Sequence, residues 1–267
     1  MTPPIATPGT TADAFARAKE QGRAALVGYL PAGYPSFQGA IEAIEAMIDA
    51  GCDIIEIGLP YSDPVMDGPT VAMAAQKALD EGIRTADVLH TVEAVANKGI
   101  PVVVMTYWNP VERYGVPRFA ADLASAGGAG LITPDIIPEE AGEWISAADE
   151  QGLDKIFLVA PSSTTQRLHL TVEACRGFVY ASAVMGVTGA RQASSTLAEP
   201  LVRRTRELTD LPIAVGLGVS TAAQAAELAG YADGVIVGSA FIKALESDGT
   251  RGLSALVADL AKGVRRD

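Results

Sequence analysis

Short apolar runs alternate with amphipathic segments of helical length along almost the whole chain. Apolar residues three and four positions apart, preceded by Ser, Thr or Pro and followed by Gly, predict a helix after each strand. A further helix at 12–21 precedes the first strand, and two helices, at 239–246 and 253–264, follow the last one. The β-branched and apolar runs predict eight strands, at 24–30, 54–58, 101–107, 130–133, 154–160, 178–182, 212–216 and 234–238.

This order of elements predicts an α/β fold built from parallel βαβ units. Eight such units in 267 residues indicate a (β/α)8 TIM barrel with an extra N-terminal helix and a short extra helix after strand eight. An open doubly wound sheet is the competing fold, but the turn LPAGYPS after the first strand is not a dinucleotide-binding glycine turn. Because no linker or composition break interrupts the pattern, we predict one domain over 1–267, with 1–9 as a disordered tail.

The second predicted strand carries an acid among apolar residues. Side chains alternate between the two faces of a strand, so Glu56 shares its face with Ile54 and Gly58. The acid lies either in water on an edge strand or in the interior, where an unpaired charge is costly and needs a function. Asp63 and Asp67 follow in a Pro- and Gly-rich loop. A strand acid with loop acids beyond its C-terminal end predicts acid–base chemistry.

Glycines and a helix start follow the last two strands. Gly216 and Gly218 end the seventh strand, and Gly238 and Ser239 end the eighth and open the helix at 239–246. Glycine lets the backbone approach an anion, and a helix N-terminus presents free N–H groups. In TIM barrels these two strand ends often form a phosphate site, and we predict one here.

The mouth of the predicted barrel has two further features. The long polar loop at 185–196 is either a flexible solvent loop or a lid; we favour a lid, with Gly189 reaching the same phosphate. Aromatic and apolar residues at strand ends could line a slot for a flat apolar group, although each could equally be a core residue: Tyr29, Met105, Tyr107 and Tyr180.

Composition and charge exclude several classes of protein. A net charge of −12 with no basic block makes nucleic acid and anionic membranes poor partners. The N-terminus does not resemble a signal peptide, and no apolar run has the length of a membrane span, so we expect a cytoplasmic protein.

The inventory of reactive side chains leaves carboxylates as the candidate catalysts. His90 and His169 lie in helix-like runs, and Lys155 lies at the start of strand five, the wrong end for a Schiff-base lysine. No His, Asp and Glu residues have metal-ligand spacing, so we expect no metal.

These residues resemble one known family. The stretch EIGLPYSDPVMDGPT at 56–70 closely resembles the signature of the tryptophan synthase alpha chain. The order of other segments is also similar: YLPAGYPS after strand one, TYWNPV after strand three, GVTGAR after strand six, GLGVS after strand seven and GSA after strand eight.

The resemblance implies a lyase that cleaves indole-3-glycerol phosphate to indole and glyceraldehyde 3-phosphate. By this likeness, Asp67 stabilises positive charge at the indole nitrogen, while Glu56 protonates the ring carbon and takes the glycerol hydroxyl proton. The remaining matched positions are the phosphate contacts Gly189, Gly218, Gly238 and Ser239, the indole-pocket residues Tyr180 and Met105, with Tyr29 beside them, and the lid residue Thr188.

The family also implies a partner. This is the tryptophan synthase beta chain, which holds pyridoxal phosphate and receives indole within a complex of two alpha and two beta chains; the alpha chain itself needs no cofactor. One departure is that Tyr34 stands where many members carry Asp. Three alternatives stay open: another phosphate-binding barrel isomerase, a non-catalytic activating subunit, and a free-standing indole-3-glycerol-phosphate lyase.

Overall fold

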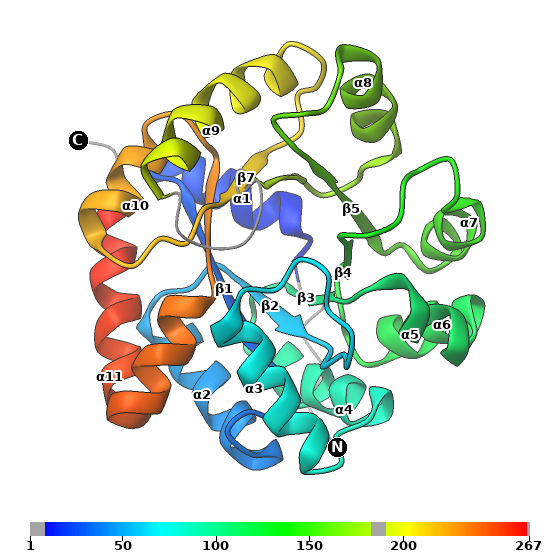
Figure 1. Ribbon diagram of the computed structural model, residues 1–267, viewed down its shortest axis with the longest axis vertical. Helices are drawn as coiled ribbons and strands as arrows, with labels where there is room; N and C mark the ends of the chain where they lie inside the picture. The colour runs from blue at the N-terminus through cyan, green and yellow to red at the C-terminus, as the bar shows by residue number, and fades with distance from the viewer. Residues whose placement is uncertain (1–8, 183–190, 266–267) are drawn as a thin grey trace.

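The computed structural model describes residues 9–182 and 191–265, and the strands among them close into a barrel. Every strand pairs in parallel with its neighbours in sequence, and β1 pairs with β8. The predicted (β/α)8 barrel is therefore confirmed, and the strands lie inside a ring of helices (Figure 1). The strands are β1 Ala25–Pro31, β2 Ile54–Gly58, β3 Val102–Met105, β4 Gly130–Thr133, β5 Asp154–Val159, β6 Val179–Ser182, β7 Ile213–Gly216 and β8 Gly234–Val237.

The helices follow the strands in the predicted order. They are α1 Thr11–Glu20, α2 Phe37–Ala50, α3 Pro69–Asp80, α4 Thr85–Ala96, α5 Trp108–Tyr114, α6 Val116–Ser125, α7 Gly142–Gln151, α8 Thr165–Ala174, α9 Arg191–Arg206, α10 Ala222–Ala229 and α11 Ser239–Gly263.

The predicted helices differ from the structure most at α9 and α11. Helix α9 begins at Arg191, inside the stretch 185–196 that was predicted as loop. The two predicted C-terminal helices form one element, α11, with a break at Gly249, whose φ of 64° and ψ of −160° are not helical. Glycine reaches this backbone conformation without a steric penalty, so the chain continues as helix on both sides of it.

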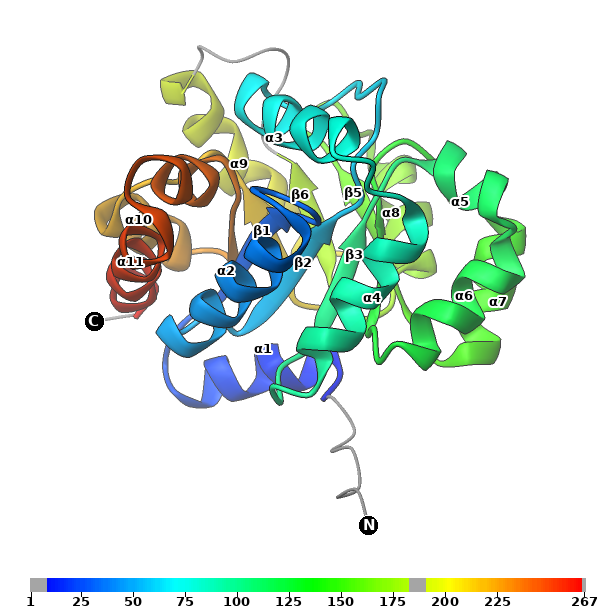
Figure 2. The ribbon, with the colours of Figure 1, turned by 90° about the horizontal axis from the view of Figure 1, so that it is seen from below.

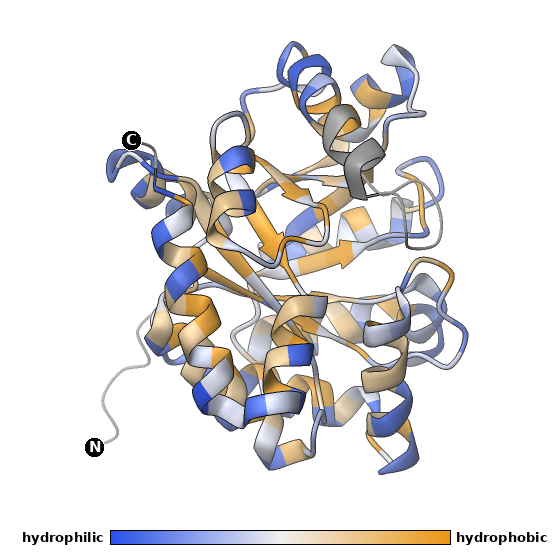
Figure 3. Cartoon of the chain, turned by 60° about the vertical axis from the view of Figure 1, so that its left-hand side comes forward, coloured by the Kyte–Doolittle hydropathy of each residue, from blue (hydrophilic) through white to orange (hydrophobic). Residues whose placement is uncertain are grey.

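The chain has two apolar cores, one inside the barrel and one outside it. The inner core contains alternate strand residues such as Val27, Ile54, Val103 and Ile156, and the outer core lies between the strands and the helices. Apolar colouring accordingly concentrates on the strands, with polar residues on the outer faces of the helices (Figure 3). This arrangement leaves the ends of the barrel as the places where polar groups can enter it.

Helix α1 closes one end of the barrel. It lies across the lower end of the strands, opposite α3 and the loop that precedes α3 (Figure 2). Its Phe15 ring packs 5.2 Å from the Phe178 ring, and Phe15 and Ala18 belong to the inner core. We call this end, at the N-termini of the strands, the floor, and the opposite end the mouth.

Candidate active site

The last inward-facing layer of the barrel, at the mouth, is polar and aromatic. Period-two alternation carries β2 from Ile54 in the inner core to Glu56 one layer higher. Glu56 is only 2% exposed, and β2 lies between β1 and β3, so the edge-strand alternative is wrong. Its Oε2 atom is buried without a hydrogen-bond partner among the described residues.

Two tyrosines lie beside Glu56, and glycines make the room for their rings. Tyr29 is paired with Glu56 in register across β1 and β2. A Cβ atom at Gly58 would lie 2.3 Å from the Tyr29 hydroxyl, and one at Gly216 would lie 2.4 Å from the Tyr180 hydroxyl. Besides its predicted part in anion binding, Gly216 therefore leaves room for the Tyr180 ring. The sequence did not indicate this second role.

Asp67 approaches the same layer from the loop before α3. It is half-buried, whereas Asp63 in the same loop is exposed. The tyrosine hydroxyls and the two carboxylates are close enough to interact, since Glu56 and Asp67 both raise the pKa values of Tyr29 and Tyr180 beyond the effect of burial. The structure thus brings four predicted site residues together.

The electrostatics of the pair suit proton transfer. Burial, with a further contribution from the charge of Asp67, raises the pKa of Glu56 to about 8, so most of this carboxyl is protonated at neutral pH. Burial also raises the pKa of Asp67, while a hydrogen bond with Tyr107 opposes that rise. Two acids with different environments can divide the roles of proton donor and charged stabiliser.

Tyr107 is the member of this site that sequence reasoning missed. It was considered only as a possible wall of the slot, but its hydroxyl accepts a hydrogen bond of 3.0 Å from the Met66 backbone N–H and contacts Asp67. Met66 and Tyr107 are 41 positions apart in sequence, and no spacing pattern links the two loops that carry them.

The remaining predicted residues lie at neighbouring strand ends or outside the described residues. Met105 ends β3 and is partly buried against both cores. Gly218 has a positive φ of 66°, and Gly238 precedes Ser239, the first residue of α11. Thr188 and Gly189 lie outside the described residues.

The histidines and the lysine that the sequence analysis weighed as catalysts lie outside the mouth. His90 and His169 are exposed on helices, and Lys155 pairs with Asp149 at 2.6 Å near the start of β5. Tyr34 is buried, with the Lys77 ammonium 5.4 Å from the centre of its ring. Within 9–182 and 191–265 there is no cluster of three His, Cys, Asp or Glu side chains fit for a metal ion. None of the described helices is long and apolar enough to cross a bilayer.

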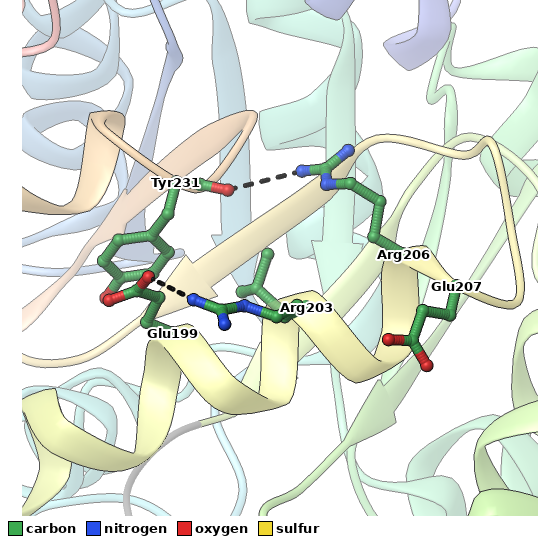
Figure 4. Close-up of a pocket in the computed structure, with 6 residues that line it drawn as sticks. Glu199, Arg203, Arg206, Glu207 and Tyr231 are labelled. Atoms are coloured by element: carbon green, nitrogen blue, oxygen red, sulfur yellow. Dashed lines mark hydrogen bonds and ion pairs between the residues drawn. The ribbon is translucent and has the colours of Figure 1, made fainter.

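A separate hollow of about 310 Å³ lies on the outside of the barrel beside α9. Figure 4 shows its lining residues, among them Glu199 paired with Arg203 at 2.9 Å and Arg206 turned toward the Tyr231 carbonyl. Arg206 also pairs with Asp233 at 2.7 Å. Each of these two guanidinium groups therefore has an acidic partner within the chain.

The strands form a closed barrel, and two interacting carboxylates, one buried and one half-buried, lie among tyrosines at the C-terminal ends of the strands. These features define a barrel enzyme of the acid–base class.

Comparison with known proteins specifies which enzyme of this class. The family model for the tryptophan synthase alpha chain matches residues 15–264. The alpha chain of Mycobacterium avium is 59% identical over 252 residues, covering 94% of this chain and 93% of that one. The alpha chain of Salinispora arenicola is 60% identical, covering 94% and 96%. A solved tryptophan synthase structure from M. tuberculosis has a TM-score of 0.93 at 56% identity, covering 97% of this chain and all of that one.

The chain therefore belongs to the tryptophan synthase alpha chain family. It is a carbon–carbon lyase of tryptophan biosynthesis that cleaves indole-3-glycerol phosphate, and it works with the beta chain. The comparisons support this function and not the free-standing lyase or the isomerase.

Proposed function

We propose that Glu56 is the general acid and base of this cleavage and that Asp67 is its electrostatic partner. The observation that carries the proposal is a buried, mostly protonated Glu56 next to a second carboxylate at the barrel mouth. A protonated carboxyl donates, and the carboxylate it leaves behind accepts, so one residue can serve both halves of the reaction.

The proton transfers balance in two steps. Glu56 first protonates the ring carbon of indole that bears the glycerol chain, and the negative charge of Asp67 stabilises the positive charge that develops at the ring nitrogen. The Glu56 carboxylate then removes the proton of the adjacent glycerol hydroxyl. The carbon–carbon bond breaks, its electron pair returns to the ring, and indole, an aldehyde and a protonated Glu56 result.

The indole ring would occupy the slot lined by Tyr29, Met105 and Tyr180. Support comes from period-two alternation, which turns the three residues to the same inner face as Val27, Val103 and Phe178. Tyr29 is in addition paired in register with Glu56. Because the pKa values of both tyrosine hydroxyls are raised, these groups stay neutral and add no charge beside the carboxylates. A neutral slot favours a flat apolar ring.

The phosphate would bind at the ends of β7 and β8. Gly218 provides a backbone turn at positive φ, and Gly238 and Ser239 lead into the first turn of α11, where N–H groups and the helix dipole attract an anion. A Cβ atom at Gly238 would also lie 3.0 Å from the Tyr29 ring, so glycine serves the slot and the phosphate site together. We assign Gly189 as a further phosphate contact and Thr188 as the lid residue from the family resemblance.

In this scheme the chain uses no cofactor of its own and acts in the cytoplasm. Pyridoxal phosphate belongs to the beta chain, which receives the indole, and the assembly is a heterotetramer of two alpha and two beta chains. No step of the proposed cleavage requires a metal ion, because charge is handled by the two carboxylates.

The test is indole release from indole-3-glycerol phosphate by the purified chain, alone and with a tryptophan synthase beta chain. Loss of a general acid–base group costs about 10²- to 10⁴-fold, so we expect Glu56→Gln to fall in that range and Asp67→Asn to lose at least about 10²-fold. Asp210→Asn, at an exposed position, is the control and should retain full activity. A folded Glu56→Gln variant with more than about a tenth of wild-type kcat would refute the assignment.

A further inference from the structure

The loop that carries Asp67 projects from the barrel. Val65 is 76% exposed and Met66 49% exposed, yet the next residue must hold a carboxylate close to Glu56. A carboxylate on such a loop needs an anchor in the body of the barrel if its position is to be maintained.

Tyr107 provides a contact of that kind. It is only 2% exposed, and its hydroxyl oxygen accepts the Met66 N–H at 3.0 Å. The hydroxyl also lies close enough to the adjacent Asp67 carboxylate to lower its pKa, and with its oxygen accepting from Met66 it is placed to donate its own hydrogen to that carboxylate. The loop backbone and the acid are thus joined through one oxygen atom.

Tyr107 is itself firmly held in the connection between β3 and α5. The preceding residue, Thr106, donates its N–H to the Ile132 carbonyl at 3.1 Å. The following residue, Trp108, donates its N–H to both carboxylate oxygens of Asp135, at 2.9 and 3.1 Å. The position of the Tyr107 hydroxyl is therefore set by β3 and β4 and not by the loop that it contacts.

A second contact between the same two segments supports the arrangement. The Tyr61 ring packs against the Tyr107 ring with 5.3 Å between centroids. The Asn109 side chain donates to the Tyr61 hydroxyl at 3.2 Å. The loop before α3 is thus attached to the residues around the start of α5 at two points, at Tyr61 near the beginning of the loop and at Met66 near its end.

We propose that Tyr107 is a positioning residue for the lyase reaction, whose hydroxyl fixes the loop at Met66 and orients the Asp67 carboxylate toward the indole nitrogen. The proposal rests on the role given to Asp67 above. The hydroxyl acts through Asp67 and needs no contact with the substrate.

Tyr107→Phe tests this directly, because it removes the hydroxyl and keeps the buried ring. Hydrogen bonds to a charged group have a net strength that corresponds to about a 10- to 100-fold effect, so we expect kcat to fall by roughly that factor. The lost bond also opposed the rise in the Asp67 pKa, so the acidic limb of the kcat–pH profile should move to higher pH. A residue with a merely structural role would lower stability without moving that limb.

Tyr114→Phe is the matched control. It removes another tyrosine hydroxyl bonded to an aspartate, the 2.7 Å contact with Asp122 between α5 and α6, outside the barrel. We expect its kcat and pH profile to be those of the wild type. A Tyr107→Phe enzyme that matches Tyr114→Phe in both measurements would overturn the proposal.

Two further measurements separate this proposal from the role of Asp67. In the Asp67→Asn background, Tyr107→Phe should cause no further loss of kcat; an undiminished second loss would contradict action through Asp67. Carbon-13 NMR titration of the Asp67 carboxyl, assigned by its absence in Asp67→Asn, should show a higher pKa in Tyr107→Phe than in the wild type, and an unchanged pKa would contradict the proposal. If Asp67→Asn is fully active, the proposed function itself fails at this residue, whatever Tyr107→Phe shows.

Discussion

The barrel holds a buried carboxylate at each end, and the two differ in how they are paired. At the floor, Asp154 begins β5 and is 5% exposed; it accepts hydrogen bonds from the Thr11 hydroxyl at 2.6 Å and the Thr11 N–H at 3.4 Å. The Arg176 guanidinium lies 3.7 Å away. At the mouth, Glu56 is buried more deeply, and its Oε2 atom has no partner among the described residues.

The difference separates a stabilising acid from a reactive one. Asp154 joins α1 to the strands, so its bonds close the floor of the inner core. Glu56 has a pKa of about 8 because burial and a neighbouring carboxylate disfavour its charged form. A buried group left without partners costs stability, and that cost is accepted where the group must exchange protons.

The largest expected effect on stability is at the floor. Asp154→Ala removes the acceptor of both Thr11 bonds and one of the two acids beside Arg176, which keeps its pair with Asp149 at 3.1 Å. Because the Thr11 donors are buried and would lose their partner, we expect a loss of about 3 kcal/mol. Urea denaturation should show this loss, while kcat per folded molecule stays at the wild-type value.

Asp210→Ala serves as the control for that measurement, because Asp210 is exposed, and it should change stability by less than about 0.5 kcal/mol. A large fall in kcat for folded Asp154→Ala would mean that the floor contributes to the chemistry and would remove the contrast between the two ends.

Replacing the carboxylate at the mouth is expected to raise the stability of the protein, not to lower it. The folded-state pKa of Glu56 is about 8 and its ordinary value 4.5, so between these pH values the folded protein binds more protons than the unfolded chain. Stability from this group is therefore greatest below pH 4.5 and is lost as pH rises toward 8. Glu56→Gln cannot ionise, so we expect it to lose about 10²- to 10⁴-fold in kcat but to be more stable than the wild type by about 2 kcal/mol or more at pH 8.

The pH dependence makes this second prediction specific. At pH 5.5 the stability gain of Glu56→Gln should be much smaller than at pH 8, because the wild-type carboxyl is then protonated in the folded protein. Denaturation curves for both proteins across this range give the measurement. A Glu56→Gln protein that is less stable than the wild type at pH 8, or a gap that does not change with pH, would contradict the unpaired state of Glu56.

Periodicity was sufficient to predict the mouth of the barrel because it concerns residues within one strand. Alternation in β2 put Glu56 on the same face as Ile54, although only the structure shows that this is the inner face, and the order of strands put Tyr29 and Tyr180 at the same end. Once the barrel closes, strand ends that are distant in sequence become neighbours, so the active-site layer follows from the fold.

Contacts between loops and helix ends could not be predicted in the same way. The bond from Met66 to Tyr107 and the bonds from Thr11 to Asp154 join segments that no periodic pattern relates. Local composition was also misleading at the start of α9, where a Ser- and Thr-rich stretch predicted a loop but the structure has a helix from Arg191. Tertiary packing decides such boundaries more than propensity does.

The start of α1 shows the same limit, because one of its threonines has a local partner and the other a distant one. The helix predicted at 12–21 begins at Thr11, and Thr10 caps it, with its side chain accepting the Asp13 N–H at 3.2 Å. Thr11 begins α1, and its hydroxyl points to Asp154, 143 residues further along the chain. Two adjacent threonines therefore have different partners, one local and one distant.

Thr11→Val is the smallest change that examines the floor carboxylate. It removes the hydroxyl while keeping the size of the buried side chain, so we expect a loss of about 1 to 2 kcal/mol in unfolding free energy. Thr205→Val is the matched control. The Thr205 hydroxyl is also buried, but it donates to the Leu201 carbonyl within α9, and this carbonyl keeps its helical hydrogen bond in the variant. The loss of stability should therefore be smaller. In the Asp154→Ala background Thr11→Val should cost almost nothing further, because the acceptor is already absent. An equal cost in both backgrounds would show that Thr11 stabilises α1 by packing alone. The Thr11 hydroxyl would then not stabilise Asp154, and the contrast in pairing between Asp154 and Glu56 would be lost.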